Sequence, residues 1–382
     1  MDKDEDVRRF FMIQKKDNLK KMAFFMVMVT LTLTVCLAIF LGYFTYRVYK
    51  NPFKKVNVRY LGGSYMEGDK EAGYISIKNT SVIEESEEVG SYHIYTDQRG
   101  ARVNSKGEQK PANVEIITLG CSFAYGYRVE NEHTFTERLG REFGVPASNF
   151  ALPGYGTVQS LQMLKRNLGL KPKVVIYGFI PDHPRRNLTP CVLNNAPFCR
   201  AVSFVDFNEH KEPYIHLPRF ELFDPKLFNK FEDEVLYSGG VGFKDILWRI
   251  RTDLYRFKEW KDIKYPDDPV SRKISTAYLI NEMSKVAKTI DAKLIIVYLP
   301  LFGKGYAQPP PEELLASLSS DILFVDMYPK VVEYYKKENS PALTIPGDYA
   351  HPGELGHALI SHELEKAIRR ENLLKESISA KY

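Results

Sequence analysis

Short runs of apolar, largely β-branched residues alternate with segments of helical periodicity from residue 114 towards the C-terminus. Runs of this kind suit strands buried on both faces of a parallel sheet, and the amphipathic segments between them suit the helices that cover those faces. We therefore expect an α/β fold, a doubly wound parallel sheet in a helix-covered sandwich. The expected strands lie at or near 114–119, 149–150, 174–179, 294–299 and 322–325, and the expected helices at or near 134–144, 156–168, 272–290, 329–337 and 353–370.

The first apolar run, 114–119, leads directly into the segment GCSFAYG at 120–126. A serine on a strand-to-helix turn exposes its hydroxyl, and nearby backbone N–H groups can face a reacting carbonyl. Far downstream, Asp348 and His351 lie three residues apart. Together with Ser122 they supply a nucleophile, a base and a group that orients the base, which is the pattern of a serine esterase.

The sheet topology predicts where these residues meet. Ligand sites in open α/β sheets lie beyond the carboxyl ends of the strands. We therefore expect Ser122, Gly154, Asp182 and the loop 346–352 to converge at that edge, because each follows an expected strand or lies near the end of the domain.

Each of the three chemical residues also has a structural interpretation. Ser122 could cap the following helix, and Asp348 and His351 could stand at the capped start of another. Their joint presence favours catalysis, because Asp348 can accept from one imidazole nitrogen while the other faces Ser122. Cys121 is a poor rival nucleophile, since its side chain should point away from that of Ser122 and into the core.

Three blocks in this order resemble the SGNH (GDSL-type) esterase and lipase superfamily. They are GCSF at 120–123 with Gly126 and Val129, NFALPGYG at 149–156, and DYAHP at 348–352 followed by LGH at 355–357. The turn Thr96-Asp97-x-x-Gly100 resembles the lead-in of membrane-anchored members. The resemblance covers residues 90–370 and implies a flavodoxin-like fold of SGNH type. It also implies the triad Ser122, Asp348 and His351, and an oxyanion hole that includes the backbone N–H groups of Ser122 and Gly154.

Two positions depart from the family's pattern. Cys121 replaces the usual aspartate before the serine, which we interpret as a tolerated variant. The third block of the family contains Gly-x-Asn-Asp, whose asparagine completes the oxyanion hole, but IPDHPRRN at 180–187 has no asparagine at the matching place. We expect His183, or as second choice Asn187, to substitute, or else a hole with two backbone donors. Loss of one such donor typically costs about a hundred- to a thousandfold in rate.

Residues 22–46 contain no charged side chain. A helix needs about 20 mostly apolar residues to cross a bilayer, and Tyr43, Phe44 and Tyr46 suit the headgroup zone. The run exceeds the roughly 7–15 apolar residues of a cleavable signal peptide, and no Ala-x-Ala site follows. We predict a transmembrane helix at 22–46 after a cytoplasmic leader at 1–21. The bias of basic residues places the C-terminal part outside the cytoplasm.

The remaining domain boundaries follow from changes in pattern. Residues 52–110 are polar and hairpin-like and predict a β-rich lead-in between the membrane and a catalytic domain at 111–375. An insertion at 184–271, rich in proline and aromatic residues, interrupts the alternation. It is either a substrate-binding lid or a scaffold with its own small core. Cys191 and Cys199 could close a disulfide across a turn-rich loop, or be two unrelated thiols.

Composition argues against several classes of protein. The net charge is only +5, without a basic patch interleaved with aromatics, so nucleic-acid binding is not expected. The histidines lack metal-ligand spacing and there is no glycine-rich phosphate loop, so we expect no metal and no cofactor. Arg185 and Arg186 could hold an anionic glycan or lipid headgroup, although surface arginines are more often only solvated.

The sequence therefore predicts a single-pass membrane protein that acts as a serine esterase. Its substrate would be an acyl ester of an envelope carbohydrate, a lipid or a similar molecule, cleaved through an acyl-serine intermediate. Two alternatives stay open. One is an O-acyltransferase that passes the acyl group to a glycan hydroxyl, and the other is a non-catalytic binding module with the same fold.

Overall fold

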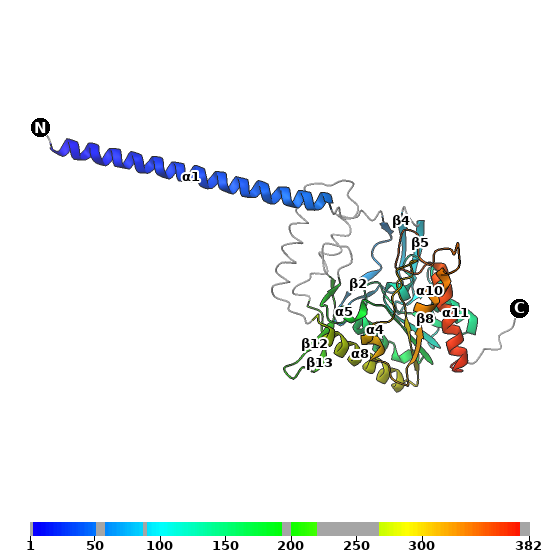
Figure 1. The fold of residues 1–382 in the computed structure, drawn as a ribbon. Helices are drawn as coiled ribbons and strands as arrows, with labels where there is room; N and C mark the ends of the chain where they lie inside the picture. Colours follow the sequence, from blue (N-terminus) through cyan, green and yellow to red (C-terminus); the bar gives the residue numbers. More distant parts are fainter. Residues whose placement is uncertain (1–2, 51–57, 87–89, 193–199, 220–266, 375–382) are drawn as a thin grey trace. The chain divides into compact units, whose positions relative to one another are not determined.

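A computed structural model of the chain describes residues 3–50, 58–86, 90–192, 200–219 and 267–374. The chain divides into two units. Helix α1 (Lys3–Lys50) belongs to the first, and the sheet and helices that follow belong to the second. Figure 1 shows both units as a ribbon.

Helix α1 contains the segment Gln14–Tyr43, in which an 18-residue window has a mean hydropathy of 2.6, and this segment is long and apolar enough to cross a membrane. The expected span at 22–46 lies inside α1. The hydroxyls of Thr30, Thr32 and Thr34 donate to carbonyls four residues back in the helix, at 2.8–2.9 Å. These bonds satisfy polar groups that lipid could not.

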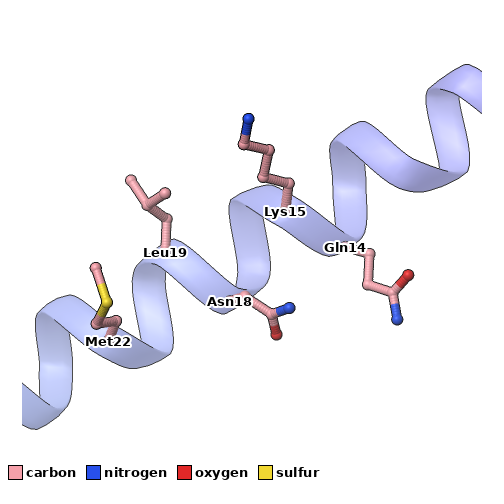
Figure 2. A pocket seen from close by; sticks show the side chains of 5 residues that line it. All are labelled: Gln14, Lys15, Asn18, Leu19 and Met22. Carbon is pink, nitrogen blue, oxygen red and sulfur yellow. The ribbon is translucent and has the colours of Figure 1, made fainter.

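The charged end of the apolar segment carries a shallow hollow on the surface of α1. Figure 2 shows its lining side chains, which are Gln14, Lys15, Asn18, Leu19 and Met22. All of them come from two turns of one helix. We therefore regard the hollow as helix surface rather than as a binding site.

In the described part of the second unit, one mixed sheet has the strand order β1-β4-β5-β6-β8-β7-β9-β14-β15. Strands β8, β7, β9, β14 and β15 are mutually parallel, and strands β1, β4, β5 and β6 pair in antiparallel orientation. In sheet order the bounds are Val58–Leu61, Ser81–Ser86, Gly90–Thr96, Arg102–Val103, Ala147–Asn149, Ile116–Gly120, Val174–Phe179, Lys293–Tyr298 and Leu323–Asp326.

The lead-in is part of this sheet. Strand β6 pairs with β8 in antiparallel orientation through Arg102 and Asn149. Strands β1, β4, β5 and β6 therefore extend the parallel sheet beyond β8. These four strands belong to the same layer as the strand that carries the first sequence block.

Helices pack on this sheet in two pairs, with α3 against α11 and α4 against α8. The chain crosses from β7 to β8 in one direction and from β8 to β9 in the other, so right-handed crossovers put α3 and α4 on opposite faces. The prediction of a parallel-dominant sheet with flanking helices is confirmed. Among its described residues, the second unit has the helices α2 (Ser122–Tyr125), α3 (Phe135–Phe143), α4 (Thr157–Arg166), α5 (His183–Arg186), α8 (Pro269–Thr289), α9 (Glu312–Leu315), α10 (Tyr328–Tyr335) and α11 (Glu354–Arg370), with 3₁₀ turns at Asn131–His133 and Leu168–Leu170.

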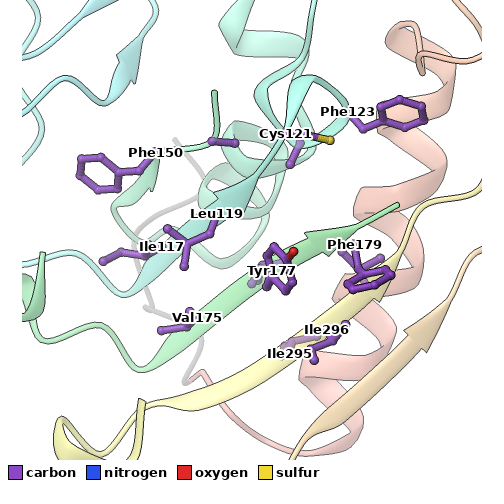
Figure 3. Packing of buried hydrophobic residues seen from close by; sticks show 14 of the residues in the cluster. Ile117, Leu119, Cys121, Phe123, Phe150, Val175, Tyr177, Phe179, Ile295 and Ile296 are labelled. Atoms are coloured by element: carbon purple, nitrogen blue, oxygen red, sulfur yellow. The ribbon is translucent and has the colours of Figure 1, made fainter. Parts of the chain in front are cut away.

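The core lies on both faces of the parallel strands. Every residue of β7 and β9 is buried, as the continuous apolar runs predict. Figure 3 shows Ile117, Val175 and Ile295 from three neighbouring strands packed with the residues around them. This packing holds the carboxyl end of β7 rigidly.

Three two-stranded sheets complete the described fold, and only the first lies in the lead-in. It pairs β2 (Met66–Asp69) with β3 (Gly73–Ser76). The other two belong to the insertion. They are β10 (Cys191–Val192) with β11 (Arg200–Ala201), and β12 (Phe204–Phe207) with β13 (Pro213–His216).

The described part of the insertion packs into the core, because Val202 and Val205 are buried in the main hydrophobic cluster. Residues 220–266 of the expected lid lie outside the described residues. Cys191 is disulfide-bonded, whereas Cys36 and Cys121 are free thiols. Cys199, its expected partner, also lies outside the described residues.

Candidate active site

A pair of glycines shapes the turn that carries Ser122. Gly120 ends β7 with φ of 142°, and it faces Gly178 of β9 in the sheet register. A Cβ atom on either glycine would lie 2.9 Å from Cβ of Ala124 in α2. Helix α2 can therefore rest directly on the sheet only because both positions lack a side chain. Ser122 is the first residue of this helix and is 9% exposed.

Ser122, His351 and Asp348 form a continuous hydrogen-bonded chain. Ser122 Oγ lies 2.9 Å from His351 Nε2, and His351 Nδ1 lies 2.7 Å from Asp348 Oδ2. Asp348 Oδ1 accepts from the backbone N–H groups of Ala350 and His351, at 2.5 and 3.1 Å. Ser122 thus lies next to Asp348 and His351, although more than 220 positions separate it from them in the sequence.

The protonation state of this chain follows from its partners. Burial raises the pKa of Asp348, but the hydrogen bond and charge of His351 and the two backbone N–H donors outweigh it, so the pKa is lowered overall. An ionised Asp348 accepts the proton on Nδ1 of His351. The other nitrogen, Nε2, is then free to accept from the hydroxyl of Ser122.

Aromatic rings hold His351 on two sides. The ring centroid of Phe123 lies 4.7 Å from that of His351, and the centroid of Tyr127 lies 5.1 Å away. Burial and the nearby Glu84 carboxylate raise the pKa of Tyr127 to about 12, so its hydroxyl stays neutral. Arg128 lies over the Tyr127 ring and forms a 3.1 Å ion pair with Glu84 of β4. Sequence reasoning missed Tyr127, although it lies one residue beyond the segment at 120–126.

A buried arginine stabilises the turn that carries Ser122. Helix α2 is one turn long, so the carbonyls of its last residues lack partners within the helix. Arg102 Nη1 donates to the carbonyls of Tyr125 and Gly126 at 2.7 and 3.0 Å, and Asn149 Nδ2 donates to the carbonyl of Ala124 at 3.0 Å. Arg102 is 1% exposed. Sequence reasoning missed it; the only signal was the turn at 96–100 that precedes it.

The second block supplies a loop with a left-handed glycine. Gly154 has φ of 87°, and the N–H of Leu152 donates to the carbonyl of Gly120 at 3.0 Å, which ties the loop to the end of β7. Among the residues that the structure describes, neither the N–H of Ser122 nor that of Gly154 donates to another protein group. Both N–H groups are therefore unsatisfied by the described part of the protein.

Neither residue expected to replace the missing asparagine has exposed surface. His183 is fully buried, with Nδ1 2.7 Å from the hydroxyl of Tyr177, and burial lowers its pKa well below the usual value. Asn187 is also fully buried, and its Oδ1 accepts from the N–H of Thr157 at the start of α4, at 3.0 Å. These contacts give both side chains structural roles. They favour the other expectation, a hole with backbone donors alone.

Cys121 and Asp182 contact groups outside the hydrogen-bonded chain of Ser122, His351 and Asp348. Burial raises the pKa of the Cys121 thiol although the charge of Arg186 opposes it, so the thiol stays protonated. Figure 3 shows Cys121 among the buried residues of the core. Asp182 forms 2.8 Å ion pairs with Arg185 and Arg186. Arg185 and Arg186, considered above as possible ligands of an anion, therefore already share a carboxylate.

No protein-family model and no curated protein matches the sequence. Several solved structures are similar to the structure of this chain. A lipolytic protein of the G-D-S-L family from Desulfitobacterium hafniense DCB-2 shares 12% identity over 67% of this chain and 99% of its own, with a TM-score of 0.32. A GDSL-like lipase from Bacteroides thetaiotaomicron VPI-5482 shares 13% over 67% and 88%, with a TM-score of 0.31. An acetylxylan esterase from Geobacillus stearothermophilus shares 10% over 71% and 100%, with a TM-score of 0.34.

Proposed function

We propose that this chain is a membrane-anchored serine esterase of SGNH type in which Ser122, His351 and Asp348 act as one catalytic unit. One observation carries the proposal. Two hydrogen bonds join residues from two of the sequence blocks. Ser122 Oγ lies 2.9 Å from His351 Nε2, and His351 Nδ1 lies 2.7 Å from Asp348 Oδ2.

The reaction follows from this geometry. Ser122 Oγ attacks the ester carbonyl carbon while its proton passes to Nε2 of His351. The backbone N–H groups of Ser122 and Gly154 bind the oxyanion that forms. The intermediate collapses as the C–O bond to the alcohol breaks, and the imidazolium gives its proton to the departing alkoxide. Water, deprotonated by His351, then attacks the acyl-serine, which releases the carboxylic acid and restores the hydroxyl of Ser122.

The substrate we propose is an acyl ester of an envelope carbohydrate, a lipid or a similar molecule. The apolar segment of α1 supports attachment to a membrane. The disulfide of Cys191 supports an oxidising compartment for the catalytic domain, because cytosolic thiols are kept reduced.

Acyl transfer to a glycan hydroxyl is the second candidate. The observation that favours it is the low exposure of Ser122, which is only 9%. An acyl-serine with little access to water lives longer, and an alcohol bound beside it could then take the acyl group in place of water.

The test uses the full-length protein in detergent, with a fluorophosphonate probe and p-nitrophenyl acetate. Labelling and hydrolysis should both vanish in Ser122→Ala and persist in Cys121→Ala. Retained labelling in Ser122→Ala would overturn the proposal. A glycan hydroxyl that raises product release above the rate in water would favour the transferase.

A further inference from the structure

The loop that presents Gly154 is held by the lead-in through two reciprocal hydrogen bonds. The hydroxyl of Tyr74, on β3, donates to the carbonyl of Pro153 at 2.7 Å. The hydroxyl of Tyr155 donates to the carbonyl of Tyr74, also at 2.7 Å. The two tyrosines are 4% and 1% exposed, and their ring centroids lie 5.3 Å apart. The contact is therefore buried and has a fixed geometry.

The residues of this loop form a β-turn whose sequence also suits a second turn type. The N–H of Tyr155 donates to the carbonyl of Leu152 at 3.1 Å, with Pro153 and Gly154 at the two central positions. Proline followed by a glycine with φ of 87° is the signature of a type II turn. Proline is equally suited to the first central position of a type I turn, in which the peptide between the two central residues is flipped. Glycine can adopt the second central position of either turn.

The bond from Tyr74 acts on the peptide that carries the proposed oxyanion donor. The carbonyl of Pro153 and the N–H of Gly154 belong to one planar unit, and the described chain contains no cis peptide bond. In a trans peptide the two groups point in opposite directions. A hydroxyl that holds the carbonyl on one side therefore fixes the direction of the N–H on the other. It also polarises the amide, which strengthens the N–H as a donor.

We propose that Tyr74 is a positioning residue for the oxyanion hole, which locks the Pro153–Gly154 peptide in the orientation that directs its N–H at the substrate. This inference rests on the proposed esterase function. Tyr74 lies on β3, in the lead-in and outside the three sequence blocks, so the inference gives the lead-in a part in the chemistry.

The test compares Tyr74→Phe with wild type on p-nitrophenyl acetate, with rates expressed per site titrated by fluorophosphonate. Removal of the hydroxyl frees the peptide to flip, so kcat should fall by about ten- to a hundredfold, the scale of a misplaced catalytic group. KM should change by less than about twofold, because ground-state binding makes little use of an oxyanion donor. The affinity for phenylboronic acid, whose serine adduct places an oxygen in the hole, should fall together with kcat.

The matched control is Tyr298→Phe. Tyr298 is also a fully buried tyrosine, and its hydroxyl donates to the carbonyls of Gln308 and Pro309, at 3.0 Å each, in a loop that carries no proposed catalytic group. Its kcat and boronate affinity should match wild type. If Tyr74→Phe behaves like Tyr298→Phe, the proposal is wrong.

Two further variants separate the possible failures. Hydrolysis by Ser122→Ala would overturn the esterase proposal itself, whatever Tyr74→Phe does. Should Tyr74→Phe not fold, Tyr155→Phe loosens the same turn from its other side, and it must then show a loss of kcat at constant KM. Activity of Tyr155→Phe equal to that of Tyr298→Phe would contradict the inference.

Discussion

At the scale of single residues, the coupling between Ser122, His351 and Asp348 has a measurable consequence. His351 can take the proton of Ser122 only while Asp348 holds its ring in the right tautomer, so the three residues should act as a unit. Alanine at any one position should remove most activity, and the triple variant should lose little more, as in coupled triads. Steady-state rates of the four variants provide the measurement. Losses that add up would mean that the residues are independent structural elements.

A buried histidine predicts how stability depends on pH. His357 is fully buried, and its Nδ1 accepts from the N–H of Phe135 at the start of α3, at 3.2 Å. Burial, followed by the charges of Arg102 and Arg138, lowers its pKa from 6.5 to about 3. Below pH 6.5 the unfolded chain gains a proton there that the folded chain does not bind. Stability from this group is therefore complete above pH 6.5 and is lost as pH falls towards 3.

The slope should reach about 1.4 kcal/mol per pH unit within that window. His357→Asn keeps an acceptor for the N–H of Phe135 and removes the titration. The measurement is the free energy of unfolding by urea at several pH values for both proteins. Their difference, with the wild type falling faster as pH drops, isolates His357 from the carboxylates. Parallel profiles would contradict a buried neutral imidazole.

At the scale of elements, the contact between α2 and the sheet depends on Gly178. A Cβ there would lie 2.9 Å from Cβ of Ala124 and 3.0 Å from Cδ1 of Leu299. Gly178→Ala should destabilise the fold by about 1–3 kcal/mol, because the core cannot expand freely. Adding Ala124→Gly removes the nearest atom and should recover part of the loss. Thermal unfolding of the single and double variants measures both effects.

The control for this prediction is Gly169→Ala. Nothing lies within 4 Å of a Cβ built at Gly169, so the added methyl group has open space. Its melting temperature should stay close to that of wild type. A loss equal to that of Gly178→Ala would show that the destabilisation has another cause than the contact with α2.

The elements differ in how far the sequence predicts them. The strands 174–179 and 294–299 are close to β9 and β14 because an apolar run is a local signal. The contribution of the lead-in to the main sheet was not predicted, because Arg102 pairs with Asn149 across 46 intervening residues and no local pattern specifies such pairing.

The site shows the same division. Ser122, Asp348 and His351 were found because their chemistry is carried by distinctive side chains in short motifs. Arg102 and Tyr74 were missed because their partners are backbone carbonyls, which every sequence offers. The expectation for His183 and Asn187 could not be decided from sequence, because burial in the finished fold gives both a different set of partners.

At the scale of the whole molecule, charge and redox state predict the side of the membrane on which the domain that follows α1 lies. The leader at 1–21 carries seven lysines and arginines, and the described segment Gln14–Tyr43 is apolar enough to span. Basic residues favour the cytoplasmic side, so the C-terminal domain should lie outside. The disulfide of Cys191 favours that same oxidising side. Two independent features, charge and redox state, therefore predict one orientation.

A reporter that is active only in the cytoplasm provides the test. Fused after Tyr382 it should be silent, and fused before Met1 it should be active. Alkylation of the intact protein should show Cys191 protected until a reductant is added, since a thiol in a reducing compartment would react at once. A bright signal from the C-terminal fusion would overturn the topology. It would also remove envelope substrates from the proposed function, because the triad would then face the cytoplasm.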